Sequence, residues 1–130
     1  MFFLYFFDGA TDCTVTEQEI IYGRYLKFGK PHDVFLGVTP CPSATADGIY
    51  SSINTVLTES IGEEWQNKAI AAGCDGATVN LGCNNSVATR LKKEHPYFLV
   101  VHCVAHRLEL AVLDVSKDKY HFLPDMLITV

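Results

Sequence analysis

The sequence predicts an α/β domain with a mixed β-sheet, and three observations support this class. Short aromatic and β-branched runs, each about as long as a strand, recur along the chain. The first three runs follow one another without a helical pattern between them, which predicts antiparallel neighbours. Apolar residues at helical spacing lie between the later runs, which predicts right-handed crossovers and parallel neighbours.

The first half of the chain contains the three consecutive strands. Residues 2–7 form an unbroken apolar run that ends at Asp8, and such a run predicts a strand buried on both faces. Residues 18–27 and 34–38 are rich in β-branched and aromatic residues and predict two further strands. Turn-forming residues at 28–33 separate these two. We therefore expect the three strands to form an antiparallel meander.

The second half alternates helices with strands. Apolar residues at helical spacing predict a helix over 44–62, and a strand at 68–74 and a second helix at 84–94 follow. The apolar residues at 98–101 predict another buried strand. The helix predicted from Cys103 to Ser116 is apolar nearly all round, so we expect protein to cover most of its sides.

The resulting order, β-β-β-α-β-α-β-α, is the plan of a ribonuclease-H-like fold, although other α/β sheets share parts of it. A chain of 130 residues allows one domain. The pattern predicts that residues 1–116 form a partial, truncated core of this kind. Residues 117–130 show no periodicity and stay unassigned.

The composition is that of a globular chain without a basic surface. Hydrophobic residues make up 48% of the sequence, and 15 acidic against 10 basic residues give a net charge of −5. Binding to nucleic-acid phosphates needs positive charge, so any nucleic-acid contact must be local or come from other regions. The five irregularly spaced cysteines predict a reducing compartment rather than a disulfide framework. No apolar run approaches the ~18 residues of a membrane span, so no membrane contact is expected.

Two aspartates follow predicted buried strands, Asp8 after the first and Asp75 after the fourth. Sites in open α/β sheets gather at the carboxyl ends of strands. If the two strands are neighbours, their backbones lie ~4.8 Å apart, and the carboxylates could share divalent ions of the kind that assist phosphodiester cleavage. Oxygen ligands favour Mg²⁺ or Mn²⁺. The alternative is that each aspartate only begins a turn, as the Asp75-Gly76 pair suggests.

Three motifs occur in an order that resembles a known family. They are residues 8–12 (DGATD), 73–80 (GCDGATVN) and 102–111 (HCVAHRLELA). Together, over about residues 2–115, they resemble the hAT (hobo/Ac/Tam3) transposase-like domain. The closest likeness is to transposon-derived zinc-finger proteins of host genomes. The resemblance implies a ribonuclease-H-like nuclease core.

The resemblance also implies roles for particular residues. Asp8 and Asp75 fall on the positions that bind catalytic Mg²⁺ or Mn²⁺ in active members of the family, and Cys103 and His106 fall on the family's Cys-x-x-His motif. The family's third acidic ligand, a glutamate, follows a long helical insertion before which this chain stops. Glu109 comes too early to replace it.

A second departure from the family pattern is Ala10, where many members have Trp. We therefore expect a transposase-derived domain without catalytic activity and without a required cofactor, from a nuclear, DNA-associated or protein-interaction protein. DNA or nuclear proteins would be contacted through regions outside this chain, and the full-length protein could be a homo-oligomer.

Two alternatives to this non-catalytic function stay open. The chain could be the metal-binding half of a DNA nuclease, completed by residues missing here, or a gene fragment without its own role. Loss of the final helix predicts exposed apolar surface.

The third motif has two other interpretations. Cys103 and His106 could bind zinc together with Cys74, Cys83 or His102, but structural zinc usually takes two close pairs of ligands and only one close pair exists. The spacing of the two histidines is similar to His-Glu-x-x-His of metalloproteases, but a cysteine occupies the place of the glutamate. The simpler interpretation is that the cysteine packs as a small apolar side chain and that His106 forms a hydrogen bond near the sheet edge.

Overall fold

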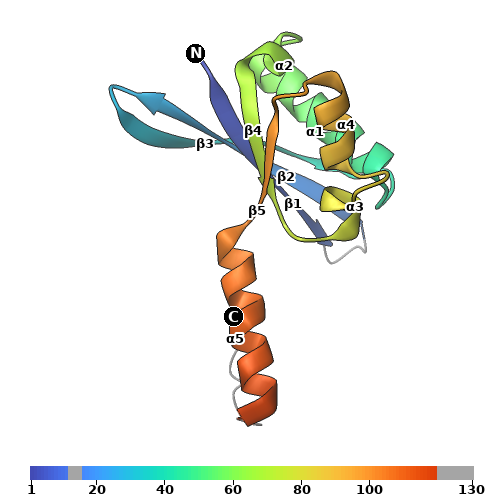
Figure 1. Cartoon of the computed structure of the whole chain (residues 1–130). Helices are drawn as coiled ribbons and strands as arrows, with labels where there is room; N and C mark the ends of the chain where they lie inside the picture. The colour runs from blue at the N-terminus through green and yellow to red at the C-terminus, as the bar shows by residue number, and fades with distance from the viewer. Residues whose placement is uncertain (12–15, 120–130) are drawn as a thin grey trace.

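The computed structural model describes residues 1–11 and 16–119 and has an α/β fold (Figure 1). Its elements are β1 (Phe3–Thr11), β2 (Glu17–Lys27), β3 (Lys30–Pro40), α1 (Ala46–Ile61), α2 (Trp65–Lys68), β4 (Ala69–Cys74), α3 (Thr78–Leu81), α4 (Val87–Glu94), β5 (Leu99–His102) and α5 (Val104–Lys119). The five strands form one sheet in the order β3-β2-β1-β4-β5. The β1–β2 and β2–β3 pairs are antiparallel, and the β1–β4 and β4–β5 pairs are parallel. The predicted α/β class and mixed sheet are confirmed.

β2 and β3 form a longer hairpin than the sequence predicts. The turn contains only Phe28 and Gly29, whose φ angles of 52° and 73° give the left-handed conformation that two-residue hairpin turns require. β3 therefore begins directly after this turn, and the predicted turn over 28–33 followed by a strand at 34–38 is wrong in its bounds. Pro31 is tolerated because β3 is an edge strand.

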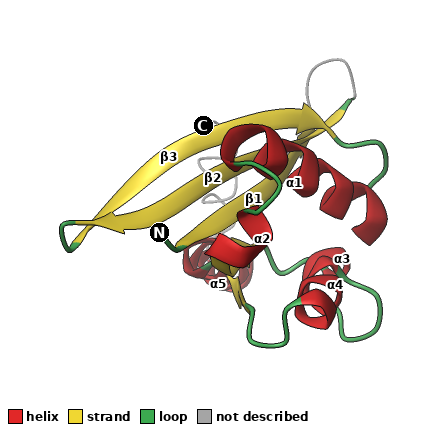
Figure 2. Ribbon diagram, turned by 90° about the horizontal axis from the view of Figure 1, so that it is seen from above, coloured by secondary structure: helices red, strands yellow, loops and turns green. Residues whose placement is uncertain are grey.

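The core lies between one face of the sheet and the helices α1, α3 and α4, which lie on the same side of it (Figure 2). Tyr5 of β1 stands edge-to-face to Trp65, with ring centroids 6.0 Å apart, and lies 6.1 Å from the ring of Phe98. Burial of these large side chains is the main driving force for folding. The largest fully buried side chains are Trp65, Tyr5, Ile21, Ile53, Leu57, Leu91, Val87 and Ser86.

Polar caps define where the two main core helices begin. The hydroxyl of Thr45 accepts a hydrogen bond from the backbone N–H of Gly48 at the start of α1, at 3.2 Å. At the start of α4, Ser86 and Thr89 each accept a hydrogen bond from the other's backbone N–H, a capping box. Both predicted helices are confirmed, with bounds within about three residues.

Two strands that were predicted to be buried on both faces are covered on only one. On β1, Phe3, Tyr5 and Phe7 are buried, whereas Leu4 and Phe6 are only half-buried. Alternate residues of β5 are likewise exposed. The physical reason is that α1, α3 and α4 lie on one side of the sheet, so the side chains that alternate to the other face meet no helical layer.

α5 is largely exposed, so the expectation that protein covers this helix is wrong. The helix occupies the predicted positions, but Val104 is 77% and Leu108 65% exposed. In Figure 1 it extends away from the sheet. No helix or strand in the described part of the chain packs extensively against it. The exposed apolar surface that the sequence predicts is therefore present, and part of it lies on α5.

Two one-turn helices, α2 and α3, were not predicted, because four residues are too few to show a helical period. The predicted boundary at residue 117 falls inside α5, and residues 120–130 lie outside the described part of the chain. Among the described helices, none combines the length and the apolar character needed to cross a bilayer.

Replacing Tyr5 by Phe should leave the free energy of unfolding unchanged or raise it by about 1 kcal/mol, because the Tyr5 hydroxyl is buried and finds no hydrogen-bond partner among the described residues. Tyr50→Phe is the matched control. The Tyr50 hydroxyl donates to Glu94 Oε2 at 2.6 Å, so its removal should lower the free energy of unfolding by about 1 kcal/mol. Urea unfolding of both variants measures the difference. Equal losses in the two variants would contradict an unpaired Tyr5 hydroxyl.

Candidate functional site

The parallel pairing of β1 with β4 brings the two predicted aspartates together. Tyr5 lies opposite Ala72, and Phe6 lies opposite Gly73. Continued by two residues, this register places Asp8 opposite Asp75. Both aspartates line one pocket of about 490 Å³. The expectation that the first and fourth strands are neighbours is therefore confirmed.

The position of Asp8 within its strand differs from the prediction. The sequence predicted that the first strand ends at Asp8, but β1 continues to Thr11. The reason is its second neighbour: β2 pairs with β1 antiparallel as far as Thr11, opposite Glu17. The pairing with β4 ends earlier, at Phe6. Asp8 therefore lies at the end of the parallel ladder rather than at the end of the strand.

Asp75 directly follows β4 and also organises the turn after it. Its Oδ1 accepts hydrogen bonds from the backbone N–H of Ala77 at 3.0 Å and from Nδ2 of Asn80 at 2.7 Å. This is the local bonding pattern by which aspartates start turns. The simpler interpretation of Asp75, a turn-forming residue, is therefore correct as far as it goes. Asp75 also lines the pocket, so the two interpretations are compatible.

The beginning of α5 adds the predicted Cys-x-x-His pair to the same pocket. The backbone N–H of Cys103 donates to the carbonyl of Cys74 at 2.7 Å, which fixes the start of α5 beside the end of β4. Cys103 and His106 line the pocket with the two aspartates. Nδ1 of His106 lies 3.5 Å from Oε2 of Glu109, one turn further along α5. All four predicted site residues therefore meet in one pocket.

The electrostatics of this pocket favour a bound positive charge. Burial raises the pKa of Asp8, the nearby charge of Asp75 raises it further, and His106 and the backbone N–H of Gly9 oppose the rise. A carboxylate whose pKa is raised by a neighbouring carboxylate can share a proton with it or bind a cation beside it. Burial, helped by Asp75, also raises the pKa of the Cys74 thiol to about 12. A thiol with this pKa is protonated at neutral pH and is a poor zinc ligand.

His102, which precedes Cys103, lies against Gly76 of the motif at residues 73–80. His102 is the last residue of β5. A Cβ atom on Gly76 would overlap the His102 ring, so a larger residue here would have to displace that ring. The ring of His102 lies 5.9 Å from that of His106.

The zinc interpretation finds no support among the described residues. Within them, no three His, Cys, Asp or Glu side chains come close enough together to bind one metal ion. Cys83 is exposed and does not line the pocket of the two aspartates. Cys41, Cys74, Cys83 and Cys103 are free thiols. Asp12 and Cys13 lie outside the described residues.

One acidic residue near the site was not predicted. Glu19 of β2 lies opposite Gly9 of β1 and is only 5% exposed. Its burial, followed by the charges of Asp8 and Asp75, raises its pKa to about 7. The period-2 alternation of a strand could have found it, because Glu19 and the buried Ile21 share one face of β2.

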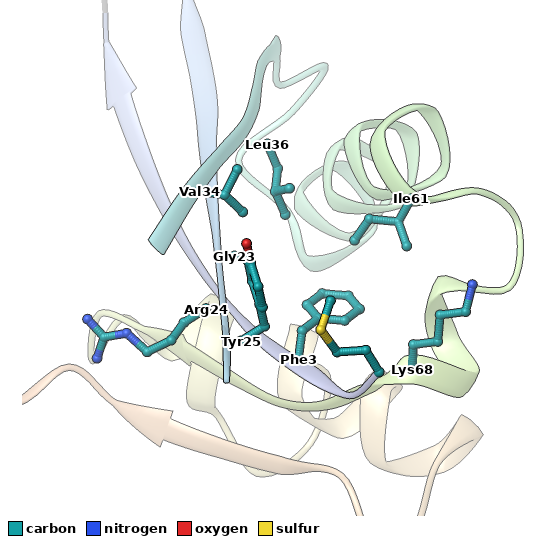
Figure 3. A pocket seen from close by; sticks show the side chains of 9 residues that line it. Phe3, Gly23, Arg24, Tyr25, Val34, Leu36, Ile61 and Lys68 are labelled. Atoms are coloured by element: carbon teal, nitrogen blue, oxygen red, sulfur yellow. The ribbon is translucent and has the colours of Figure 1, made fainter. Parts of the chain in front are cut away.

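A mainly apolar pocket of about 330 Å³ lies elsewhere, between β1, β2, β3 and the end of α1 (Figure 3). Phe3, Tyr25 and Leu36 lie around it, and the charged groups that line it are Arg24 and Lys68. None of its lining residues is a carboxylate, a thiol or a histidine, so we place the candidate chemistry at the pocket of the two aspartates.

Comparison of the chain with protein-family models gives no match.

Proposed function

We propose that this chain is a ribonuclease-H-like domain derived from an hAT-type transposase, and that it acts without cleaving DNA, as an interaction domain of a nuclear, DNA-associated protein. One observation supports the proposal most. Asp8, Asp75, Cys103 and His106 come from three separate motifs, yet they line one pocket. The order of the strands also agrees with this ancestry, since the three antiparallel strands precede the two parallel ones.

The interaction role is supported by the apolar surface. Soluble domains seldom expose many large apolar side chains together unless they bind a partner. On α5, the exposed residues Val104, Leu108, Val112 and Val115 recur at helical spacing and form one apolar stripe. Tyr22 and Phe35 expose a pair of rings on the sheet, with centroids 5.4 Å apart.

A second candidate function is favoured by the two aspartates themselves. If the domain cleaves DNA, Asp8 and Asp75 would hold Mg²⁺ or Mn²⁺, and the metal would activate water and stabilise the leaving oxygen. Within the described residues, no third His, Cys, Asp or Glu side chain comes close enough to the two aspartates to bind the same ion. Two carboxylates alone leave most of the coordination to water. A nuclease would therefore need a further carboxylate from another segment or another chain.

A plasmid-nicking assay with Mn²⁺ separates the two candidates. We expect no nicking by the wild-type protein. Nicking by the wild type that is lost in Asp8→Ala and Asp75→Ala would overturn the non-catalytic proposal. Glu63→Ala is the matched control, because Glu63 is an exposed carboxylate away from the pocket. Nicking that persists in all three variants would indicate a contaminating nuclease.

The interaction role predicts self-association through the α5 stripe. Sedimentation velocity should show species larger than the monomer at high protein concentration, and Leu108→Glu should reduce them because it places a charge in the apolar stripe. Ser51→Glu adds the same charge on the exposed side of α1 and should change nothing. A monomer at all concentrations, or equal effects of the two variants, would contradict an interaction role for α5 in homo-oligomers.

A further inference from the structure

The face of the sheet opposite α1, α3 and α4 carries a broad apolar surface (Figure 2). Ile21 of β2 and Val100 of β5 pack in the core, so their neighbours along each strand point to the opposite face. Within the described part of the chain, no helical layer covers this face. Five large apolar side chains on it are each 43–58% exposed, and we call them the open sheet face: Tyr22, Phe35, Val38, Leu99 and Val101.

Phe6 of β1 lies flat in the middle of this face. A Cβ atom on Gly73 would lie 2.6 Å from a carbon of the Phe6 ring, so the ring lies directly over the glycine. The guanidinium of Arg24 lies 5.5 Å from the centre of the Phe6 ring and donates two hydrogen bonds to Asp33, at 2.5 and 2.8 Å. Arg24 and Asp33 neutralise each other, so an apolar element that packs over Phe6 buries no unpaired charge from this pair.

α5 is an apolar helix next to this face, but it cannot cover the face of its own chain. β5 ends at His102 and α5 begins at Val104, so Cys103 alone links them. The backbone N–H of Cys103 donates to the carbonyl of Cys74, and the N–H of Arg107 donates to the carbonyl of Cys103, which fixes the first turn of the helix. Connections that reverse the chain between a helix and a strand usually take about 2–6 residues. With one linking residue, α5 extends away from the sheet (Figure 1).

The two uncovered surfaces together have the area that a stable dimer needs. The α5 stripe and the open sheet face contain nine large apolar side chains, each 43–77% exposed. At roughly 100 Å² for each half-exposed side chain, they offer about 900 Å² per chain. Stable interfaces bury about 800 Å² on each partner. Neither surface reaches this area alone, so a stable dimer needs both.

We propose that α5 of one copy packs along the open sheet face of a second copy, whose own α5 packs on the sheet of the first. This inference rests on the proposed interaction role of α5 and names the surface that α5 binds. The dimensions agree, because a helix of 16 residues is about 24 Å long and five strands span about 19 Å. A two-fold axis repeats the same helix-to-sheet contact twice and covers both apolar surfaces of both chains.

Two substitutions, one on each surface, test this exchange by sedimentation velocity over a series of protein concentrations. Leu108→Glu places a charge in the α5 stripe, and Val38→Lys places one on the open sheet face. Each should weaken the dimer by about tenfold or more, because both copies of the contact then bury an unpaired charge. Val34→Lys is the matched control and should change nothing. Val34 is on the same strand and is 41% exposed, but it lines a pocket beside Ile61 of α1, on the helical side of the sheet.

An equimolar mixture of Leu108→Glu and Val38→Lys tests whether the contact joins the helix of one copy to the sheet of another. In a mixed dimer, one helix-to-sheet contact is wild-type on both sides. The other contact brings together the two introduced charges, which have opposite signs. The mixture should therefore associate about fivefold or more tightly than either variant alone. A mixture that associates no more tightly than its components would overturn the exchange.

The remaining outcomes separate this inference from the interaction role on which it rests. A dimer that Leu108→Glu weakens and Val38→Lys leaves intact would mean that α5 pairs with α5, which keeps the interaction role and overturns the exchange. The reverse result would place the contact on the sheet alone and would also overturn it. A wild-type monomer at all concentrations would contradict both. Species that grow without limit would show that the contact does not close into a dimer, which overturns the two-fold exchange. Circular dichroism confirms that each variant is folded.

Discussion

Glu19→Gln should stabilise the metal-free protein at pH 8 by up to about 3 kcal/mol. The pKa of Glu19 rises from its ordinary value of 4.5 to about 7 in the fold, so the folded state binds the proton more tightly than the unfolded state. This contribution to stability is fully present below pH 4.5 and is lost as the pH rises to about 7. The difference of about 2.5 pKa units corresponds to about 3 kcal/mol.

Urea unfolding between pH 4 and pH 8 in the presence of EDTA measures this effect. The wild type should lose stability through that range, and Glu19→Gln should lose less. Glu63→Gln changes an exposed carboxylate and is the control. Parallel pH profiles for the wild type and Glu19→Gln would show that Glu19 is not buried as the structure has it.

Trp65→Ala should lower the free energy of unfolding by about 3–5 kcal/mol. Trp65 is 1% exposed, lies edge-to-face to Tyr5, and donates from Nε1 to Asn54 Oδ1 at 3.2 Å. Removal of the ring leaves a cavity at the centre of the core. A domain has only about 5–15 kcal/mol of stability in total, so this single substitution should remove a large part of it.

The control for this substitution separates the ring from its hydrogen bond. Trp65→Phe keeps an aromatic side chain and should cost about 1–3 kcal/mol less than Trp65→Ala. Tyr97→Ala removes a fully exposed ring and should have no measurable effect. Chemical unfolding followed by circular dichroism compares the three variants. A small loss in Trp65→Ala would contradict the central place of this residue in the core.

Elements that depend mainly on their own sequence could be predicted from local patterns. The helix over 44–62 was predictable because Ile49, Ile53 and Leu57 recur at helical spacing and are all buried. The adjacency of the first and fourth strands was a hypothesis, which the parallel pairing of β1 with β4 confirms. β3 was predicted too short because Pro31 suggests a turn, whereas its edge position tolerates a proline.

The parts that could not be predicted depend on contacts between distant segments. The exposure of α5 depends on what packs against it, and its apolar sequence alone gave the wrong expectation. The position of Asp8 within β1 depends on both strands that pair with β1. The pairing with β4 ends near Asp8, whereas the pairing with β2 continues to Thr11. Strand alternation could have shown that Glu19 is buried, but its place beside Gly9 and near the two aspartates depends on the pairing of β2 with β1.

The most direct test of the central claim is an NMR titration of the Asp8 carboxyl group in the wild type and in Asp75→Asn, with EDTA present. The substitution leaves an oxygen at position 75 that can accept the hydrogen bonds of Ala77 and Asn80. The charge of Asp75 raises the pKa of Asp8, second only to burial, so this pKa should fall in the variant. The pKa of Asp33, which pairs with Arg24, should not change. An Asp8 pKa that is the same in both proteins would show that the two aspartates do not share a pocket.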